Sequence, residues 1–151
     1  ERSYAIADLL APYADNVLSF QRGIALADRR SVTIQDEITT ASPSEIWWFM
    51  HTKASVQLGQ NESTAMLERG PSRRLWCAVA SPSDARFSLM DAKPLPSSPN
   101  PPGQNSNLGI QKLAIHLSGA TSTSLTVAMV PLSPGQEPPS EVPSMMPLAE
   151  W

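Results

Sequence analysis

Two neighbouring stretches decide the fold: Leu18-Ser19-Phe20-Gln21-Arg22-Gly23-Ile24-Ala25-Leu26 and Val32-Thr33-Ile34-Gln35-Asp36-Glu37-Ile38. In both, apolar side chains recur at every second residue, which is the period of a β-strand. One charge, Arg22 or Asp36, interrupts each apolar face. A hairpin that pairs Leu26 with Val32 also places Arg22 opposite Asp36. Because an unpaired ion facing a core costs several kcal/mol, we predict this register and an ion pair between the two side chains.

The same alternation recurs along the whole chain, between clusters of Pro, Gly, Asn and Ser. Fifteen prolines in 151 residues exclude a helical bundle, since each proline removes a backbone donor. We therefore predict an all-β fold, an antiparallel β-sandwich of about ten strands. The expected strands are residues 3–8, 17–26, 31–39, 44–52, 55–58, 63–69, 74–80, 86–90, 111–117 and 124–132.

Two proline-rich stretches interrupt the alternation. Residues 94–103 are expected to form a long surface connection, with a ligand for a proline-binding domain as the alternative. We expect residues 1–132 to form the sandwich and residues 133–151 to form a proline-rich tail that packs on it. Because a tail rich in large apolar side chains does not stay in solvent, it is expected to dock through Met145, Met146, Leu148 and Trp151.

The overall charge and the chain start limit the classes of partner. A net charge of −3 offers no footprint for nucleic acid or an anionic membrane, and binding of a polyanion through overall charge is not expected. No apolar run approaches the ~20 residues that span a bilayer. The first eight residues lack the apolar region of a signal peptide and begin inside an expected strand without Met. We therefore expect a piece of a longer protein.

The residues that carry chemistry are few. Cys77 lies in an apolar strand and is expected to be a buried structural thiol. His51 ends a strand, and His116 is expected to face solvent because its neighbours Leu113, Ile115 and Leu117 share the opposite face. No spacing of His, Cys and carboxylates resembles a metal site. We assign no catalytic, cofactor-binding or metal residue, and do not expect the chain alone to be catalytic.

The stretch Glu45-Ile46-Trp47-Trp48-Phe49-Met50-His51-Thr52 is apolar on both faces. Such a strand is central, with one face in the core and the other covered by the tail or by a neighbouring domain. The alternative is a platform for sugar rings that uses Trp47, Phe49 or Trp76. Separately, Asn61-Glu62-Ser63 is an N-glycosylation acceptor pattern in an expected turn.

Several of these stretches together resemble the C-terminal part of the heparinase II/III-like polysaccharide lyases. The likeness runs from Tyr4 to Pro131. It rests on Tyr4-Ala5-Ile6-Ala7-Asp8-Leu9, Tyr13, Phe20-Gln21-Arg22-Gly23-Ile24-Ala25-Leu26, Val32-Thr33-Ile34-Gln35-Asp36-Glu37-Ile38, Trp47-Trp48-Phe49-Met50-His51-Thr52, Lys112-Leu113-Ala114-Ile115-His116-Leu117 and Leu125-Thr126-Val127-Ala128-Met129-Val130-Pro131.

In that family, an α/α toroid precedes the β layers, and uronic-acid-containing polysaccharides are cleaved by β-elimination. The family can also hold a metal, often zinc, in its first β region. The resemblance implies that the catalytic residues, and any such zinc ion of the parent enzyme, lie outside this chain. It further implies that the rest of the lyase is the partner, that a polysaccharide is the substrate, and that the protein is secreted or periplasmic. A carbohydrate-binding module and a protein-interaction β-domain are the alternative functions.

Overall fold

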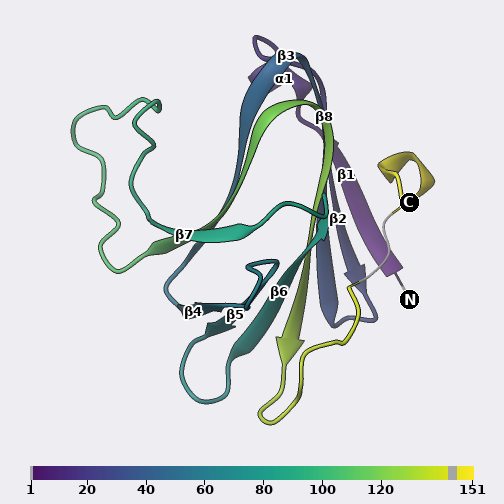
Figure 1. Cartoon of the computed structure of the whole chain (residues 1–151), viewed down its shortest axis with the longest axis vertical. Helices are drawn as coiled ribbons and strands as arrows, with labels where there is room; N and C mark the ends of the chain where they lie inside the picture. Colours follow the sequence, from purple (N-terminus) through teal and green to yellow (C-terminus); the bar gives the residue numbers. More distant parts are fainter. Residues whose placement is uncertain (1, 143–145) are drawn as a thin grey trace.

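The computed structural model describes residues 2–142 and 146–151, which form eight strands and two short helical segments. All strand pairs are antiparallel, which confirms the predicted all-β class (Figure 1). The order in the sheet is β1-β2-β3-β8-β6-β5-β4, and β7 pairs with β8. The elements are β1 (Arg2–Asp8), α1 (Leu10–Tyr13), β2 (Val17–Ala27), β3 (Ser31–Thr52), β4 (Ser55–Leu58), β5 (Thr64–Glu68), β6 (Arg74–Ser81), β7 (Phe87–Asp91), β8 (Gln111–Leu132) and the 3-10 segment η1 (Leu148–Glu150).

The strand count is lower than expected because β3 and β8 each span two predicted strands. Both have 22 residues and pair with each other along most of their length. Their register is irregular between Thr39 and Ile46, next to Pro43, and Gly119 in β8 has a left-handed φ of 65°. Such irregularities bend a strand without ending it. The predicted breaks at these points are therefore bends within continuous strands.

The bends in β3 and β8 fold the sheet over a shared core. The first half of β8 pairs with β7, and its second half pairs with β6. Leu113 and Ile115 from the first half belong to the same buried cluster as Leu125 and Val127 from the second. The cluster also contains Trp48, Ala65, Leu67, Cys77, Ala85, Phe87 and Met129. Packing between the two halves gives the layered arrangement of a β-sandwich.

The β2–β3 hairpin has the predicted register. Leu26 pairs with Val32 and Arg22 pairs with Asp36, and the Arg22 guanidinium donates two hydrogen bonds of 2.6 Å to the Asp36 carboxylate. The Asp36 side chain is 3% exposed and that of Arg22 is 36% exposed. The carboxylate is thus buried, and its counter-ion reaches solvent.

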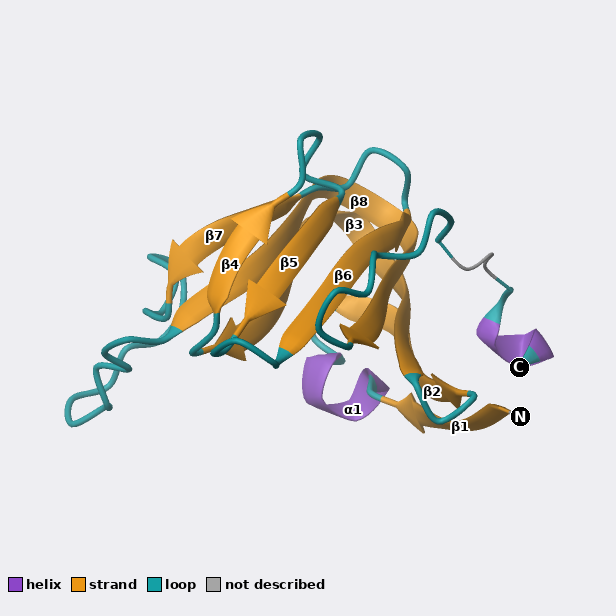
Figure 2. Ribbon diagram, turned by 90° about the horizontal axis from the view of Figure 1, so that it is seen from below, coloured by secondary structure: helices purple, strands orange, loops and turns teal. Residues whose placement is uncertain are grey.

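The apolar face of β2 is less buried than the sequence indicates. Phe20 is buried, but Ile24 and Leu26 are 47% and 40% exposed, and Leu18 is exposed as well. In Figure 2, β1 and the adjoining end of β2 lie at one edge of the molecule, away from β4, β5 and β7. Every described residue of β1 is exposed. The β1–β2 hairpin therefore presents apolar side chains to solvent.

The C-terminal strap, residues 146–151, lies on the opposite face of β1–β3. Leu148 is 2% exposed, and its backbone N–H donates to Glu37 Oε1 at 2.8 Å. The Met146 carbonyl accepts hydrogen bonds from the Gln35 side-chain amide and the Trp151 indole. The strap is fixed by both backbone and side-chain contacts, while Met145 lies outside the described residues.

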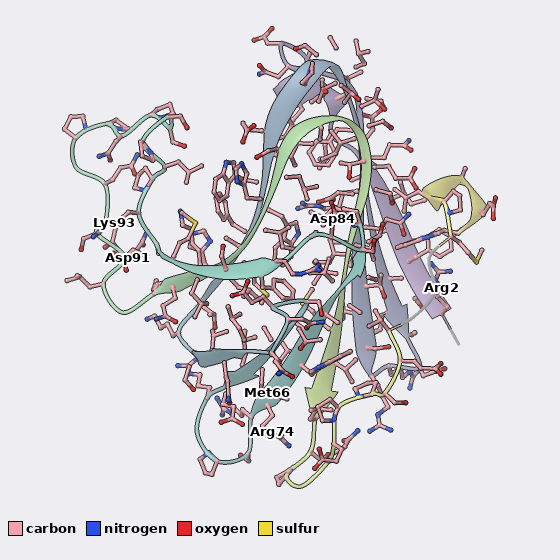
Figure 3. All side chains as sticks on the ribbon, in the orientation of Figure 1. Arg2, Met66, Arg74, Asp84, Asp91 and Lys93 are labelled. Carbon is pink, nitrogen blue, oxygen red and sulfur yellow. The ribbon has the colours of Figure 1, made fainter. Side chains whose placement is uncertain are left out.

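Aromatic and cationic contacts hold the end of the strap against β1. The guanidinium of Arg2 lies 4.3 Å from the Trp151 ring centroid, and Tyr4 meets Trp151 edge to face at 6.0 Å. Arg2 lies on the side of the molecule where the strap ends, far from Asp91 and Lys93, which border the connection between β7 and β8 (Figure 3). Residues 92–110 make this connection without helix or strand. The helical segments within residues 2–142 and 146–151 are far too short to span a bilayer.

Candidate functional site

The Arg22–Asp36 pair lies in an open groove between the start of β2 and the bend of β3. The groove has a volume of about 300 Å³ and brings together one ion pair, two tryptophans and a tyrosine. Its lining includes Tyr13, Phe20, Arg22, Asp36, Ile38, Glu45, Trp47, Trp48 and Leu125. An apolar wall with a few fixed polar groups is typical of ligand sites. This groove is the candidate functional site.

The ion pair fixes the charge at the base of the groove. Hydrogen bonding to Asp36 raises the pKa of Arg22, and the Asp36 charge adds to this against the opposing effect of partial burial. Arg22 therefore stays charged across the whole physiological range. Nε and Nη2 of the guanidinium each donate a hydrogen bond to one oxygen of the Asp36 carboxylate. These two bonds hold the Arg22 side chain in one orientation.

Beside the groove, three rings form an aromatic row on the outer face of β3 and β8. Trp47 pairs with His116 across the strands, and the two rings stack with centroids 3.9 Å apart and planes 8° apart. Phe49 lies 5.6 Å from Trp47, and the Lys112 ammonium lies 4.4 Å from the Phe49 centroid. The imidazole covers one face of the Trp47 indole, so that face is closed to a sugar ring.

Glu45 joins the row to the groove through hydrogen bonds. Its Oε2 lies 2.5 Å from His116 Nε2 and accepts a hydrogen bond from the Ser118 hydroxyl at 3.1 Å. The hydrogen bond to His116 lowers the pKa of Glu45, and Ser118 contributes in the same direction. Glu45 is therefore a carboxylate at neutral pH, held where it can accept hydrogen bonds from sugar hydroxyl groups.

The structure places several predicted residues as expected. His116 is exposed, and Cys77 is fully buried, where desolvation raises the pKa of its thiol to about 12. Asp36 and Glu37 serve opposite faces, since Asp36 binds Arg22 and Glu37 binds the strap. His51 is exposed at the end of β3. None of Cys77, Asp36 and Glu37 is available as a nucleophile or an acid/base pair.

Two options that the sequence leaves open for the aromatic residues do not hold. Trp76 is 6% exposed and packs with Ala78 and Leu132, so it cannot stack on a sugar. Nor do the described residues of the C-terminal strap cover the outer face of the aromatic strand, because their contacts are with Arg2, Tyr4, Gly23, Gln35 and Glu37, in the other half of the sheet. The bend of β3 separates these two regions.

The acceptor Asn61 is exposed in the turn between β4 and β5, where its side chain accepts a hydrogen bond from the Ser63 hydroxyl. Its glycosylation stays a prediction. In the parts of the chain that the structure describes, no three His, Cys, Asp or Glu side chains gather as a metal site would require.

Sequence reasoning missed Tyr13 and Glu45 as site residues. Tyr13 lines the groove from the end of α1. This helix has four residues, which is too short to show an amphipathic pattern in the sequence. Glu45 meets His116, which lies 71 positions further along the chain, only because β3 and β8 pair. The one available signal is alternation, since Trp47 and Phe49 share a strand face and His116 lies on the outer face of its own strand.

Comparisons with known proteins give a fold. No protein-family model and no curated protein matches the chain. Among solved structures, the heparan sulfate lyase HepC from Pedobacter heparinus matches with a TM-score of 0.67 and 9% identity, over 93% of this chain and 21% of that one. A heparinase III structure matches with a TM-score of 0.64 and 9% identity, over 89% and 20%. A second heparinase III, the BT4657 gene product, matches with a TM-score of 0.65 and 9% identity, over 87% and 20%.

The resemblance expected from the sequence is therefore present in the fold. The chain spans about a fifth of the length of the solved structures that it matches, as a C-terminal β region would. At 9% identity, the likeness concerns the fold alone.

Proposed function

We propose that this chain is the C-terminal β-sandwich of a heparinase II/III-like polysaccharide lyase, where it serves as scaffold and as one wall of the substrate path. One observation carries the proposal: the fold match covers 93% of this chain and only 21% of the heparan sulfate lyase. The parent enzyme would cleave uronic-acid-containing polysaccharides by β-elimination. Its catalytic residues, and any zinc ion, would be supplied by the portion outside this chain.

The exposed β1–β2 hairpin supports the role of a wall. Ile24 and Leu26 on one face, and Tyr4 and Ile6 on the other, are all at least 40% exposed. Exposed apolar side chains that cluster on one hairpin are typical of a surface that another domain covers. The rest of the lyase is the partner that we propose for this hairpin.

The test compares the 151-residue chain with the intact source protein. Both are incubated with heparan sulfate and with alginate, and the ultraviolet absorbance of unsaturated sugar ends is followed. We expect product from the intact protein and none from the chain. Product from the chain alone would refute the non-catalytic role. An intact mass of 16.3 kDa for the source protein would refute the assignment to a larger enzyme.

The location of the protein follows from its proposed substrate. Uronic-acid polysaccharides are found outside cells, so we propose a secreted or periplasmic protein. Cell fractionation followed by immunoblotting tests this, and recovery in the cytoplasmic fraction alone would contradict it.

A carbohydrate-binding module is the second candidate, and the groove beside Trp47 favours it. Tyr13, Trp47 and Glu45 supply aromatic surface and a carboxylate acceptor in one depression. Affinity electrophoresis of a Trp47→Ala variant tests it, with Trp151→Ala, on the strap, as the matched control. Unchanged retardation of Trp47→Ala on every polysaccharide would argue against the groove as a sugar site.

A further inference from the structure

The turn between β5 and β6 concentrates positive charge in a chain that is acidic overall. The stretch Arg69-Gly70-Pro71-Ser72-Arg73-Arg74 holds three of the chain's 11 Lys and Arg residues, although the net charge is −3. The Arg69 backbone N–H donates to the Arg73 carbonyl at 2.9 Å, and Gly70 takes a left-handed φ of 71° that closes the turn. This hydrogen bond places the backbones of Arg69 and Arg73 side by side.

These arginines border an open hollow of about 410 Å³ at the start of β6. The hollow lies beside Thr52, the last residue of β3, whereas the groove lies beside residues 44–48 of the same strand. In Figure 3, Arg74 marks the position of the hollow at the start of β6. The floor is mainly apolar, and the rim is cationic. The lining residues are Thr52, Ala54, Leu67, Arg69, Ser72, Arg73, Arg74, Leu75, Pro131 and Leu132. Lys53, exposed between Thr52 and Ala54, adds a further cation at this edge.

The three arginines differ in what they bind. Arg74 is held in place by Glu68 Oε1 at 3.3 Å and by the Gln136 carbonyl at 2.9 Å. Arg69 and Arg73 are exposed, and neither side chain has an ion-pair or hydrogen-bond partner within residues 2–142 and 146–151. Two guanidinium groups thus keep all their donors free beside one apolar floor.

A guanidinium group presents a planar fork of donors that matches carboxylate and sulfate oxygens. A pyranose ring has C–H faces that pack on aliphatic side chains, while its charged substituents project from the ring edge. A hollow with Leu67, Leu75 and Leu132 below and two arginines at the rim complements both features. Nucleic acid is the poorer fit, because no residue that lines the hollow is aromatic and none can stack on a base.

We propose that this hollow is a binding site for an acidic polysaccharide, in which Arg69 and Arg73 contact carboxylate or sulfate groups. The choice of a polysaccharide rests on the proposed function, while the choice of an acidic one rests on the charge of the turn. The site would hold the polymer on the β-sandwich without taking part in its cleavage. It differs from the groove beside Trp47, whose one arginine is already bound to Asp36.

The experiment is affinity electrophoresis of the 151-residue chain in gels that contain heparan sulfate, alginate or neutral dextran. We expect retardation by one or both acidic polysaccharides, decreasing with added salt, and none by dextran. In the double variant Arg69→Ser/Arg73→Ser, the apparent affinity should fall at least about tenfold, since two charge-assisted contacts are lost. Circular dichroism confirms that each variant is folded.

The matched control is Arg29→Ser/Arg30→Ser, which removes two exposed arginines from the turn between β2 and β3 and changes the net charge equally. It should keep its affinity within about twofold. Equal losses in the two double variants would attribute binding to overall charge and overturn the proposal. So would retardation in dextran, or an unretarded wild-type chain in both acidic gels.

Two further measurements separate this proposal from others. Arg69→Lys/Arg73→Lys keeps the charge but loses the fork, and should bind with intermediate affinity. Tighter binding to single-stranded DNA than to either acidic polysaccharide would overturn the choice of ligand. This binding test is independent of the test of lyase activity. The chain can bind acidic polysaccharide whether or not the source protein cleaves it, and it can fail to bind in either case.

Discussion

Arg22 and Asp36 face each other across β2 and β3, but solvent reaches them unequally, since the Asp36 side chain is 3% exposed and that of Arg22 is 36% exposed. Loss of either partner therefore leaves a different charge behind. Loss of Arg22 would leave the Asp36 carboxylate buried without a counter-ion. Loss of Asp36 would leave the Arg22 guanidinium, which can turn toward solvent.

We predict that Arg22→Met destabilises the chain more than Asp36→Ala. The first should cost about 3–4 kcal/mol and the second about 1–2 kcal/mol, because only the first strands a buried ion. The double variant Arg22→Met/Asp36→Leu should be more stable than Arg22→Met alone. Urea unfolding measures all three free energies, and equal losses for the two single variants would contradict the predicted asymmetry.

The pKa of Glu45 depends on His116. Because the hydrogen bond lowers the pKa of Glu45 in the folded chain, its contribution to stability is present above the pKa of an ordinary glutamate. That contribution is lost as the pH falls through the lowered value. NMR titration should give Glu45 a midpoint below that of a model glutamate, and His116→Asn should raise it. An unchanged Glu45 midpoint in His116→Asn would refute the coupling.

Cys77 should be unreactive in the folded chain. It is fully buried, and desolvation raises the pKa of its thiol to about 12, so almost no thiolate forms near neutral pH. The rate of labelling by a thiol reagent should be negligible under native conditions and rise through the urea transition. Rapid labelling well below that transition would show that the core around Cys77 opens locally.

Gly23→Ala should displace the strap. A Cβ at Gly23 would overlap Leu148 and Trp151, although the backbone of β2 tolerates alanine. We expect a loss of about 1–3 kcal/mol and a change in Trp151 fluorescence. In a chain truncated after Val142, the same substitution should have little effect. A similar loss in both chains would place the strain within the sheet instead.

The register of the β2–β3 hairpin was predictable because each strand carries one charge in an apolar face, and only one register joins them. The lengths of β3 and β8 were not, because Pro43 and Gly119 are local break signals. Continued pairing across the bends overrides those signals. The exposure of Ile24 and Leu26 was also hidden, since alternation shows which side chains share a face but not whether anything covers that face.

The groove and the arginine-rimmed hollow follow from long-range pairing rather than from local pattern. Trp47 meets His116, and Thr52 comes near Leu132, only after the sheet has folded over. The sequence does place Arg69, Arg73 and Arg74 in one turn, but it does not show the apolar floor beside them. A cluster of charged residues can be recognised in a sequence. The apolar surface beside it, which completes the proposed binding site, forms only in the tertiary structure.

The shared strands β3 and β8 also decide how the chain can fold and be divided. Each contributes one half to either layer, so neither layer has a complete set of strands without the other. Unfolding should therefore be cooperative, and no cut through the bends leaves a self-sufficient half. Most of the pairing joins residues far apart in sequence, a topology associated with slow folding. This region can therefore be transferred to another protein only whole.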